Sequence, residues 1–464
     1  MPAAQRGSGR DRYAARRAWA EEANGALPKS ARLSYEGSHA FGGDEVHRWR
    51  LGNGLSVLVL IDASAPIVSY HTWFRVGSRH ERAGKTGLAH LFEHLMFNET
   101  ENLAPGAFDR KLEENGAETN AATWVDWTYY YESLPADRVK LAIKLESERM
   151  ARLVLREQQV ASEKEVVANE RRYRVDDDVE GSANELLYKI AFVKHPYGWP
   201  TIGWMEDIQS FSPEDCAAFY RTYYAPNNAT VVAVGDLRER DFLIAIRDAY
   251  GGIGSQPIPA EDIIPEPAQL EERSAVVRKP TVTEKLLVAF KGPALGDADH
   301  ATLTVLGEVL FGGRASRLYR TLVVERELAT DLRSWVTTFR DPGLFECWAT
   351  ARSSHTTYEL QAVIDEAFER VRTEVISEEE LARAKARLEL GMLQQLETIP
   401  GKAEQIGFFE SVIGDPVYAF RRVEAFRRST ASDLRRAARR YLNNEARTVV
   451  RVLPEAAGGS AAAQ

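Results

Sequence analysis

Two segments of this chain, 218 residues apart, follow the same pattern and constrain its fold more than any other feature. Residues 212–234 and 430–452 each read as a capped helix that leads into a strand, and both contain Thr-Val-Val in the strand. Without gaps, Asp215 is aligned with Asp433. Two helix–strand units can resemble each other by chance, but the shared register favours a duplicated α+β domain.

A proline-rich stretch separates the two similar segments. From Ser255 to Ser274 the chain contains four prolines and several acidic residues without helical or strand periodicity, which is typical of an extended connector. The length allows roughly two to four domains. We therefore expect an N-terminal extension (1–44), a first domain (45–254), the linker (255–274), a similar second domain (275–455) and a C-terminal tail (456–464).

Composition limits the classes of function. Hydrophobic residues make up 44% of the chain and charged residues 27%, which is ordinary for a soluble protein with proper cores. The formal net charge of −9 argues against nucleic acid as the main partner. No stretch resembles a membrane span, and two cysteines give no disulfide framework. The first 30 residues lack the apolar core of a secretory signal, so we expect a cytoplasmic protein, or a periplasmic one if a signal was removed.

The chemistry of the chain is concentrated in residues 90–94, His-Leu-Phe-Glu-His. Histidines at i and i+4 share one face of a helix, the flanking apolar residues recur at helical spacing, and Thr86 is a candidate N-cap. Two imidazoles beside a carboxylate are the groups of a catalytic zinc site in the order His-x-x-Glu-His. Such a pair can also be surface residues or satisfied core groups, but burying three ionisable groups without a partner is costly.

A catalytic zinc ion has three protein ligands and an open position for water, so a third ligand should come from another element. Cys216 and Cys347 lie far apart in core-like segments and are poor candidates. Segment 157–178 is expected to form a charged amphipathic helix, in which Glu163 and Glu170 lie two turns apart on one face. Its apolar side is expected to contain Val160, Val166 and Val167. From composition alone, both glutamates would be interpreted as solvated surface charges. Their spacing alone does not overturn that interpretation.

The motif at 90–94, followed by the segment from Glu163 to Glu170, resembles the pitrilysin/insulinase family of zinc peptidases. The family's third ligand is a glutamate at a spacing that leads here from His94 to Glu170, 76 residues later. Further motifs between residues 45 and 235 resemble the same family: Leu51-Gly52-Asn53-Gly54-Leu55, Gly116-x-x-x-Asn120-Ala121-x-Thr123-x-x-Asp126-x-Thr128-x-Tyr130, and His195-Pro196-Tyr197 with Pro200 and Gly203.

The resemblance implies one zinc ion per chain, held by His90, His94 and Glu170, with Glu163 orienting a histidine ligand from outside the coordination shell. Glu93 is implied to be the general base, which takes a proton from the attacking water and passes it to the leaving amine. The implied reaction is hydrolysis of a peptide bond.

The substrate implied by the resemblance is a peptide or an unfolded polypeptide segment. Asn120 and Ala121 are implied to lie on an edge strand that accepts the substrate as an additional strand. The same residues also fit an ordinary alternating strand, which the sequence does not separate from the functional interpretation.

The second domain lacks the metal motif. At the offset of 218, Glu93 corresponds to Phe311 and His94 to Gly312, so we expect 45–254 to be a zinc-binding catalytic domain and 275–455 an inactive homologous one. The resemblance implies an α+β fold with two similar domains, each a mostly antiparallel sheet flanked by helices. Together they are expected to form half of a clamshell chamber.

The second half also departs from the family pattern. Self-sufficient members carry an Arg and a Tyr that contact the substrate carbonyl, and these positions fall here on Val323 and Thr330, which cannot stabilise an oxyanion. Either the alignment slips, the enzyme is degenerate, or a related partner subunit provides the Arg/Tyr pair. The intact metal motif favours the last interpretation, a zinc-bearing subunit of a heterodimeric peptidase.

Two other functions remain open. A non-catalytic core or assembly subunit of the same fold has no physical need for His90, Glu93, His94 and Glu170 in register, which argues against it. A specific peptidase that removes targeting peptides would use the same chemistry as a general endopeptidase.

Overall fold

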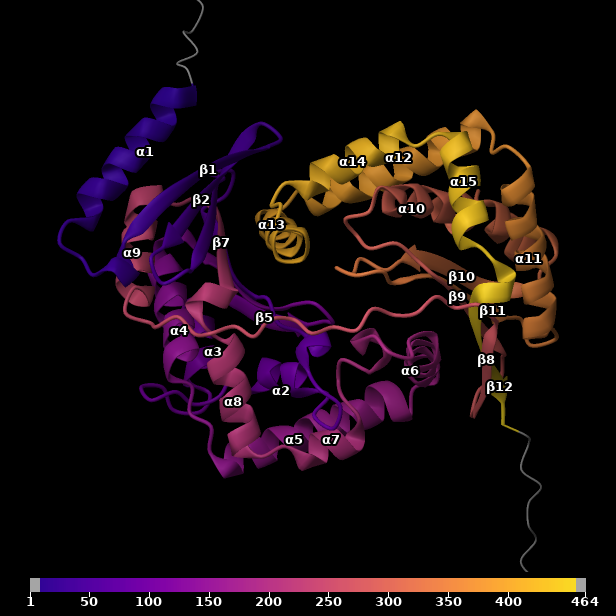
Figure 1. Ribbon diagram of the computed structural model, residues 1–464, viewed down its shortest axis with the longest axis horizontal. Helices are drawn as coiled ribbons and strands as arrows, with labels where there is room; N and C mark the ends of the chain where they lie inside the picture. The colour runs from indigo at the N-terminus through magenta and orange to yellow at the C-terminus, as the bar shows by residue number, and fades with distance from the viewer. Residues whose placement is uncertain (1–8, 456–464) are drawn as a thin grey trace, which may run out of the picture. The chain divides into compact units, whose positions relative to one another are not determined.

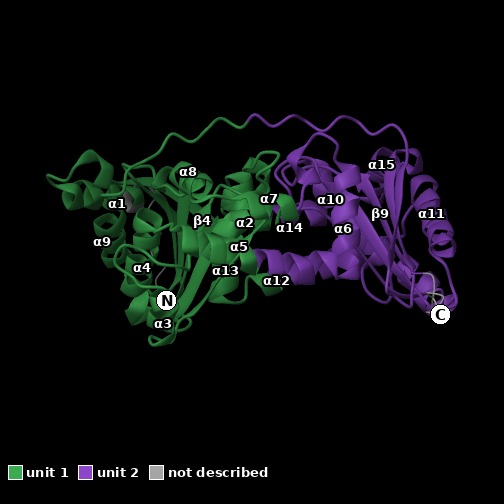
Figure 2. Cartoon of the chain, turned by 90° about the horizontal axis from the view of Figure 1, so that it is seen from below, with its two compact units in different colours: residues 1–166, 201–261, 394–420 green, residues 167–200, 262–393, 421–464 purple. Residues whose placement is uncertain are grey.

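The computed structural model describes residues 9–455, which form two compact units (Figure 2). Unit 1 consists of the chain up to Val166, Thr201–Glu261 and Gln394–Phe420. Unit 2 consists of Val167–Pro200, Asp262–Leu393 and the chain from Arg421 onwards. The expected tail 456–464 lies outside the described residues.

Unit 1 is built on a seven-stranded sheet in the order β1-β2-β3-β7-β4-β6-β5 (Figure 1). All neighbouring strands are antiparallel except β3 and β7. The strands are β1 (Leu33–Phe41), β2 (Asp44–Leu51), β3 (Ser56–Ile61), β4 (Ile67–Phe74), β5 (Glu118–Thr123), β6 (Thr128–Pro135) and β7 (Ala229–Gly235). The helices are α1 (Gly9–Asn24), α2 (Leu88–Leu95), α3 (Ala107–Glu113), α4 (Val139–Arg152), α7 (Met205–Ser210), α8 (Pro213–Tyr223), α9 (Glu239–Tyr250) and α13 (Ile399–Ile413). Strand β1 lies within the segment 1–44 that we expected to be an extension.

Unit 2 is built on a five-stranded sheet in the order β10-β11-β9-β12-β8. Its strands are β8 (Arg273–Lys279), β9 (Lys285–Lys291), β10 (Ala329–Val336), β11 (Leu344–Ala351) and β12 (Arg447–Pro454). Its helices are α6 (Val179–Ala191), α10 (Ala298–Phe311), α11 (Thr357–Thr373) and α15 (Ala431–Tyr441). Three helices run from one unit into the other: α5 (Glu157–Arg171), α12 (Glu378–Gln395) and α14 (Tyr418–Arg428).

The two sheets repeat the same order. Strands β3-β7-β4-β6-β5 correspond to β8-β12-β9-β11-β10, and the single parallel pair occupies the same place in both. At the offset of 218, α8 falls on α15 and β7 falls within β12. Both helices begin with a capping box, in which Ser212 and Thr430 accept hydrogen bonds from the backbone N–H of Asp215 (3.2 Å) and Asp433 (3.1 Å). The expected pair of similar α+β domains is confirmed.

Each sheet is covered on one face by a helix from the other repeat. Helix α13 packs on β4 and β7 of unit 1, where Ile399, Ala403 and Ile406 share a core with Trp73 and Val232. Helix α6 packs on β8, β9 and β12 of unit 2. At the offset of 218, α6 corresponds to residues 397–409, so α6 and α13 are equivalent helices that have been exchanged. The boundaries 45–254 and 275–455 describe sequence repeats, whereas the compact units cross them.

The segments between these elements show two differences from expectation. The helix expected over 157–178 ends at Arg171, where a π-helical turn (Arg172–Asp176) follows. Val166 is 45% exposed, because it lies roughly 120° around the helix from the buried Val160. Residues 255–272 of the proline-rich stretch form neither helix nor strand, and its last two residues already belong to β8, which begins at Arg273. None of the helices described in residues 9–455 has the length and apolarity needed to cross a membrane.

Candidate metal centre

Helix α2 carries three of the candidate residues and begins at a glycine. Its N-cap is Gly87, whose φ of 96° is in the left-handed region that favours glycine. The carboxylate of Glu81 accepts hydrogen bonds from the backbone N–H groups of Gly87 and Ala89, both at 2.8 Å, and so caps the helix. Thr86 is not the cap that we expected, because its hydroxyl donates to Asp207 at 2.6 Å.

The start of α2 lies directly against the backbone at Gly203. A Cβ on Gly87 would lie 2.6 Å from the carbonyl oxygen of Ile202, and a Cβ on Gly203 would overlap the backbone of Thr86. The glycine that closes the motif around His195 therefore has a steric role, which is to allow this segment to pass close to the helix that carries the histidines.

The two faces of α2 differ in polarity. His90, Glu93 and His94 are half-buried, and the two imidazole rings have centroids 5.0 Å apart. The hydroxyl of Tyr130 on β6 donates to the backbone oxygen of Phe92 at 3.2 Å, so the sheet contacts the middle of the helix. The opposite face of α2 is buried and apolar, with Leu88, Leu91, Phe92 and Leu95.

Helix α5 brings two glutamates toward this polar face. The Glu163 carboxylate lies 3.6 Å from Nδ1 of His94 and accepts a hydrogen bond from Asn98 at 2.9 Å. The contact with His94 lowers the pKa of Glu163 in spite of partial burial, which acts in the opposite direction. Glu170, two turns further along the same helix, forms an ion pair with Arg174 at 3.0 Å. One continuous helix therefore positions both side chains.

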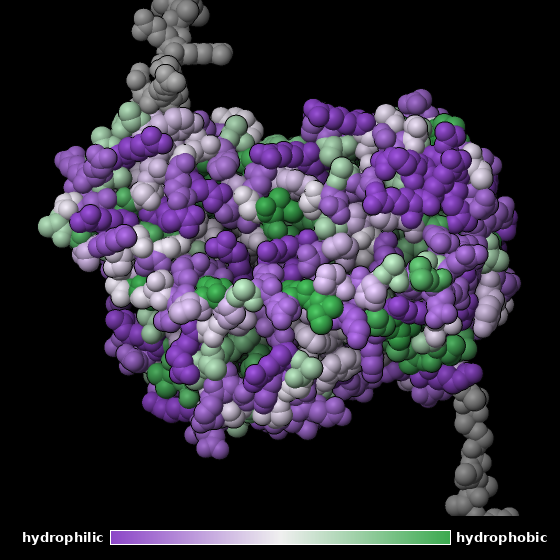
Figure 3. All heavy atoms as spheres, viewed as in Figure 1, coloured by the Kyte–Doolittle hydropathy of each residue, from purple (hydrophilic) through white to green (hydrophobic). Residues whose placement is uncertain are grey.

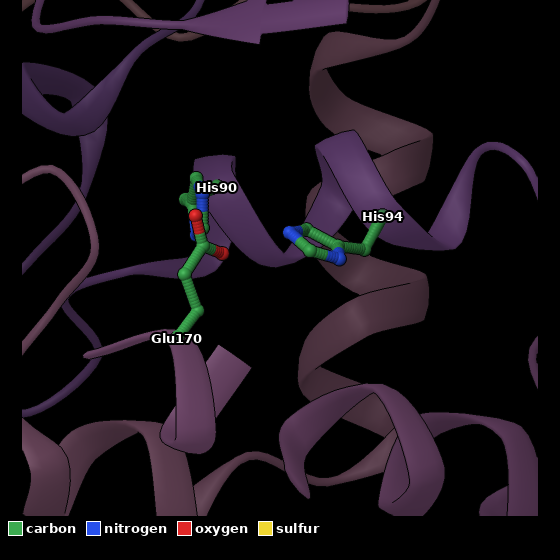
Figure 4. Close-up of side chains that lie close together, drawn as sticks. All are labelled: His90, His94 and Glu170. Carbon is green, nitrogen blue, oxygen red and sulfur yellow. The ribbon is translucent and has the colours of Figure 1, made fainter. Parts of the chain in front are cut away.

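His90, His94 and Glu170 come together (Figure 4). One ligand atom of each lies within 4.8 Å of the others, and in the part of the chain that the structure describes no other group of three His, Cys, Asp or Glu residues meets this criterion. Two imidazoles and one carboxylate are a donor set found in catalytic zinc sites. The residues present therefore fit zinc.

Asn120 and Ala121 lie on β5, the edge strand of the unit 1 sheet. They pair with Tyr131 and Tyr130 of β6 on one side, and β5 packs against α2. The side-chain oxygen of Asn120 accepts a hydrogen bond from the backbone N–H of Ala121 at 2.8 Å. The predicted peptide-binding strand and the predicted metal helix are thus neighbours within one unit.

A buried ion pair that the sequence analysis missed joins the segments next to these two elements. The guanidinium of Arg79 donates to Asp126 at 2.9 Å, and both side chains are at most 3% exposed. The backbone N–H of Arg79 donates to the oxygen of Val125. The pair connects the loop before α2 to the turn after β5. Asp126 belongs to the motif from Gly116 to Tyr130 that resembles the family. The sequence contained no indication of Arg79 as its partner, because the contact depends on the tertiary fold.

The corresponding positions of the second repeat contain no such cluster. Phe311 ends α10 in the unit 2 core, and Gly312 follows it. Val323 lies in a π-helical segment (Tyr319–Glu325) and packs against the same core, while Thr330 is an exposed residue of β10.

Two family models match the chain, one described as insulinase (peptidase family M16) over residues 57–203 and one as peptidase M16 inactive domain over residues 210–388. The zinc protease PqqE of Helicobacter pylori is 30% identical over 411 residues, which cover 87% of this chain and 92% of the relative. The probable mitochondrial-processing peptidase subunit beta of Arabidopsis thaliana is 24% identical over 426 residues, 87% of this chain and 78% of the relative.

Solved structures agree with these relatives. The crystal structure of a protease from Helicobacter pylori has a TM-score of 0.83 at 29% identity and covers 91% of this chain and 100% of that chain. The periplasmic protease PqqL from Escherichia coli has a TM-score of 0.74 at 18% identity, with 90% of this chain and 48% of that chain covered. The second likeness is one of fold alone.

Proposed function

The chain belongs to the insulinase (M16) family of peptidases, and on that premise we propose that it is a zinc-dependent endopeptidase acting on peptides or unfolded polypeptide segments. The observation that carries the proposal is the cluster of His90, His94 and Glu170 within 4.8 Å. These residues would hold one zinc ion, which supplies Lewis-acid polarisation of the scissile carbonyl and activation of the attacking water.

Glu93 is the proposed general base. It precedes His94 on the polar face of α2 and is half-buried, so its carboxylate can accept the proton of the attacking water and return it to the leaving amine. Glu163, at 3.6 Å from His94, would orient that imidazole and increase its basicity as a ligand.

The substrate is proposed to bind as an additional strand along β5, at Asn120 and Ala121. Edge strands present backbone donors and acceptors that pair with an extended peptide irrespective of its side chains. Because β5 packs against α2, a bond of such a peptide would lie near the proposed base.

We further propose that the active enzyme is a heterodimer. Support comes from Val323 and Thr330, since an apolar side chain and an exposed hydroxyl in these places do not provide the Arg and Tyr of self-sufficient family members. One of the relatives is named as a subunit, the beta subunit of a mitochondrial-processing peptidase. A related partner chain would then supply the donors that stabilise the oxyanion.

The decisive experiment compares the wild type with Glu93→Gln on a quenched fluorescent peptide library, with zinc content measured in the same samples. We expect one zinc per chain in both proteins. Hydrolysis by the wild type, alone or with a related partner subunit, should fall by roughly three orders of magnitude or more in the variant, in keeping with the size of acid–base catalysis together with water activation. Equal hydrolysis by both proteins would refute the assignment, and zinc-loaded protein inactive with every related partner would favour a non-catalytic core subunit.

A further inference from the structure

The segment that leads from β4 to α2 contacts both the strand and the helix on which the proposed function depends. We call residues 77–81 the connecting segment. The backbone N–H of Ser78 donates to the oxygen of Trp124 at 3.2 Å, and that of Arg79 donates to the oxygen of Val125 at 3.0 Å. These two acceptors directly follow β5, and the last residue of the connecting segment caps α2. The connecting segment therefore determines where β5 lies relative to α2.

Arg79 is buried together with its partner Asp126, although charged side chains belong mostly at the surface. Hydrophilic side chains predominate on the face shown in Figure 3, whereas both members of this pair are at most 3% exposed. One terminal nitrogen of the guanidinium contacts Asp126 at 2.9 Å, and the other contacts Glu261 of the linker at 3.3 Å. Glu261 also lies 3.4 Å from Nε2 of His80. Arg79 thus joins the turn after β5, the connecting segment and the linker.

The second repeat builds the corresponding junction without this ion pair. The offset of 218 carries β4 onto β9 and places Asp297 at the position of Arg79. Asp297 is exposed, and its carboxylate accepts a hydrogen bond from the backbone N–H of Ala294 at 3.0 Å. The backbone N–H of Leu295 donates to the oxygen of Phe339, just after β10, at 2.8 Å. The fold therefore does not require the ion pair, which is found in the repeat that carries the candidate centre.

We propose that Arg79 is a positioning residue, which through Asp126 fixes the peptide-accepting strand β5 relative to α2 and its histidines. The inference rests on the proposed function and adds a residue to it. A buried ion pair commonly adds no net stability over an apolar pair, but the planar guanidinium holds its carboxylates in set directions. Precise placement matters for the reaction, because a misplacement of about 1 Å between a substrate and the reacting groups can lower the rate roughly 100-fold.

Removing both charges together separates positioning from stability. Loss of either partner alone leaves a buried unpaired charge and destabilises the fold. The variant Arg79→Met/Asp126→Val removes the pair as a whole, so it should melt close to the wild type and bind one zinc ion per chain. The matched control is Arg82→Met, the same substitution of arginine at an exposed position just beyond the connecting segment.

Calorimetry with two probes measures the positioning without any turnover. Acetohydroxamate needs only the zinc site, whereas a peptide hydroxamate also pairs with β5. We expect all three zinc-loaded proteins to bind acetohydroxamate equally. The double variant should bind the peptide hydroxamate about tenfold or more weakly than the wild type and the control do, because its strand and its metal no longer fit one ligand. In hydrolysis its kcat should fall roughly 100-fold with little change in KM.

The possible outcomes separate this inference from the proposed function. If the peptide adds the same affinity in the wild type and the double variant, the positioning role is overturned and the proposed function stands. A wild type that gains nothing from the peptide would overturn strand binding along β5, and the positioning role with it. Should the double variant not fold, Glu261→Gln releases Arg79 from its partly exposed side and should weaken the peptide hydroxamate alone by roughly threefold, the equivalent of one hydrogen bond; an unchanged affinity would overturn the proposal.

Discussion

At the scale of single residues, the candidate centre depends on side chains that hold α2 and its histidines in place. Glu81 caps the helix, Tyr130 contacts it at Phe92, and Glu163 faces His94. None of these three belongs to the proposed ligand set. Each acts on a ligand indirectly, through the backbone of α2 or through an imidazole nitrogen.

Glu163→Gln is expected to weaken zinc binding without preventing it. The substitution removes the negative charge beside Nδ1 of His94 while keeping the size of the side chain, and loss of such an outer partner typically lowers metal affinity by roughly 10- to 100-fold. Chelator competition measures the effect. Glu165→Gln, an exposed position on the same helix, is the control and should bind zinc normally; equal affinities in all three proteins would contradict the role of Glu163.

At the scale of elements, the exchanged helices α6 and α13 decide whether each sheet is covered. Helix α13 can approach β4 because Gly407 faces the indole of Trp73. Helix α6 is attached differently, through a hydrogen bond of 2.5 Å from the hydroxyl of Tyr188 to the fully buried Glu346 of β11. The contact of α13 is steric and that of α6 is polar, so the two contacts lead to different predictions.

Gly407→Ala should destabilise unit 1 even though alanine is the better helix former. A Cβ at this position would overlap the Trp73 ring, so α13 would have to move away from the sheet, at an expected cost of about 1–3 kcal/mol. Gly391→Ala on α12, where nothing lies within 4 Å of the added Cβ, should instead be neutral or stabilising by roughly 1 kcal/mol or less. Urea unfolding of both variants measures the difference, and two equal effects would refute the packing argument.

Glu346→Gln should make stability less dependent on pH. Burial raises the pKa of Glu346 to about 7, while hydrogen bonds from Tyr188 and Trp348 lower it. Because the pKa is higher in the folded than in the unfolded chain, the stabilisation by the proton is complete below the unfolded value and is lost as pH rises toward and through about 7. Relative to the variant, the free energy of unfolding of the wild type should therefore fall by on the order of 3 kcal/mol between about pH 4.5 and pH 8.

Equilibrium unfolding of the two proteins across this pH range checks the sign. Parallel curves would show that Glu346 has the same proton affinity in the folded and unfolded chain. A wild type that gains stability relative to the variant as pH rises toward about 4.5 would show that the hydrogen bonds outweigh burial.

At the scale of the whole molecule, the exchange makes the two repeats dependent on each other. The first repeat lacks a helix to cover the face of its own sheet that contains Trp73 and Val232, because α13 comes from the second half of the chain. The second repeat likewise obtains α6 from the first half. Neither compact unit is a continuous piece of sequence.

A fragment of residues 1–254 is therefore expected not to fold into a stable domain by itself. Without α13 the apolar face of its sheet is exposed, which favours aggregation. Co-expression with residues 255–464 should restore a soluble complex with native circular dichroism. A monomeric, cooperatively unfolding fragment 1–254 would show that the exchanged helix is dispensable.

The sequence by itself determined the features that depend on local spacing. Helical periodicity placed His90 and His94 on one face, the proline-rich stretch was recognised as lacking regular structure, which holds up to residue 272, and the common register of 212–234 and 430–452 indicated the duplication. These features follow from neighbours within a few turns, or from a repeat that is visible without a structure. Pairing Glu170 with the two histidines required a family resemblance, because spacing along the chain carried no information about distance in space.

Only the tertiary structure decided which helix covers which sheet and what caps α2. Sequence order assigns α6 to the first repeat, but the helix packs on the sheet of the second repeat. Threonine is a common N-cap residue, but the hydroxyl of Thr86 donates a hydrogen bond to Asp207, and Glu81 caps the helix instead. Both outcomes depend on groups distant in sequence that become neighbours on folding, and a linear pattern contains no measure of that proximity.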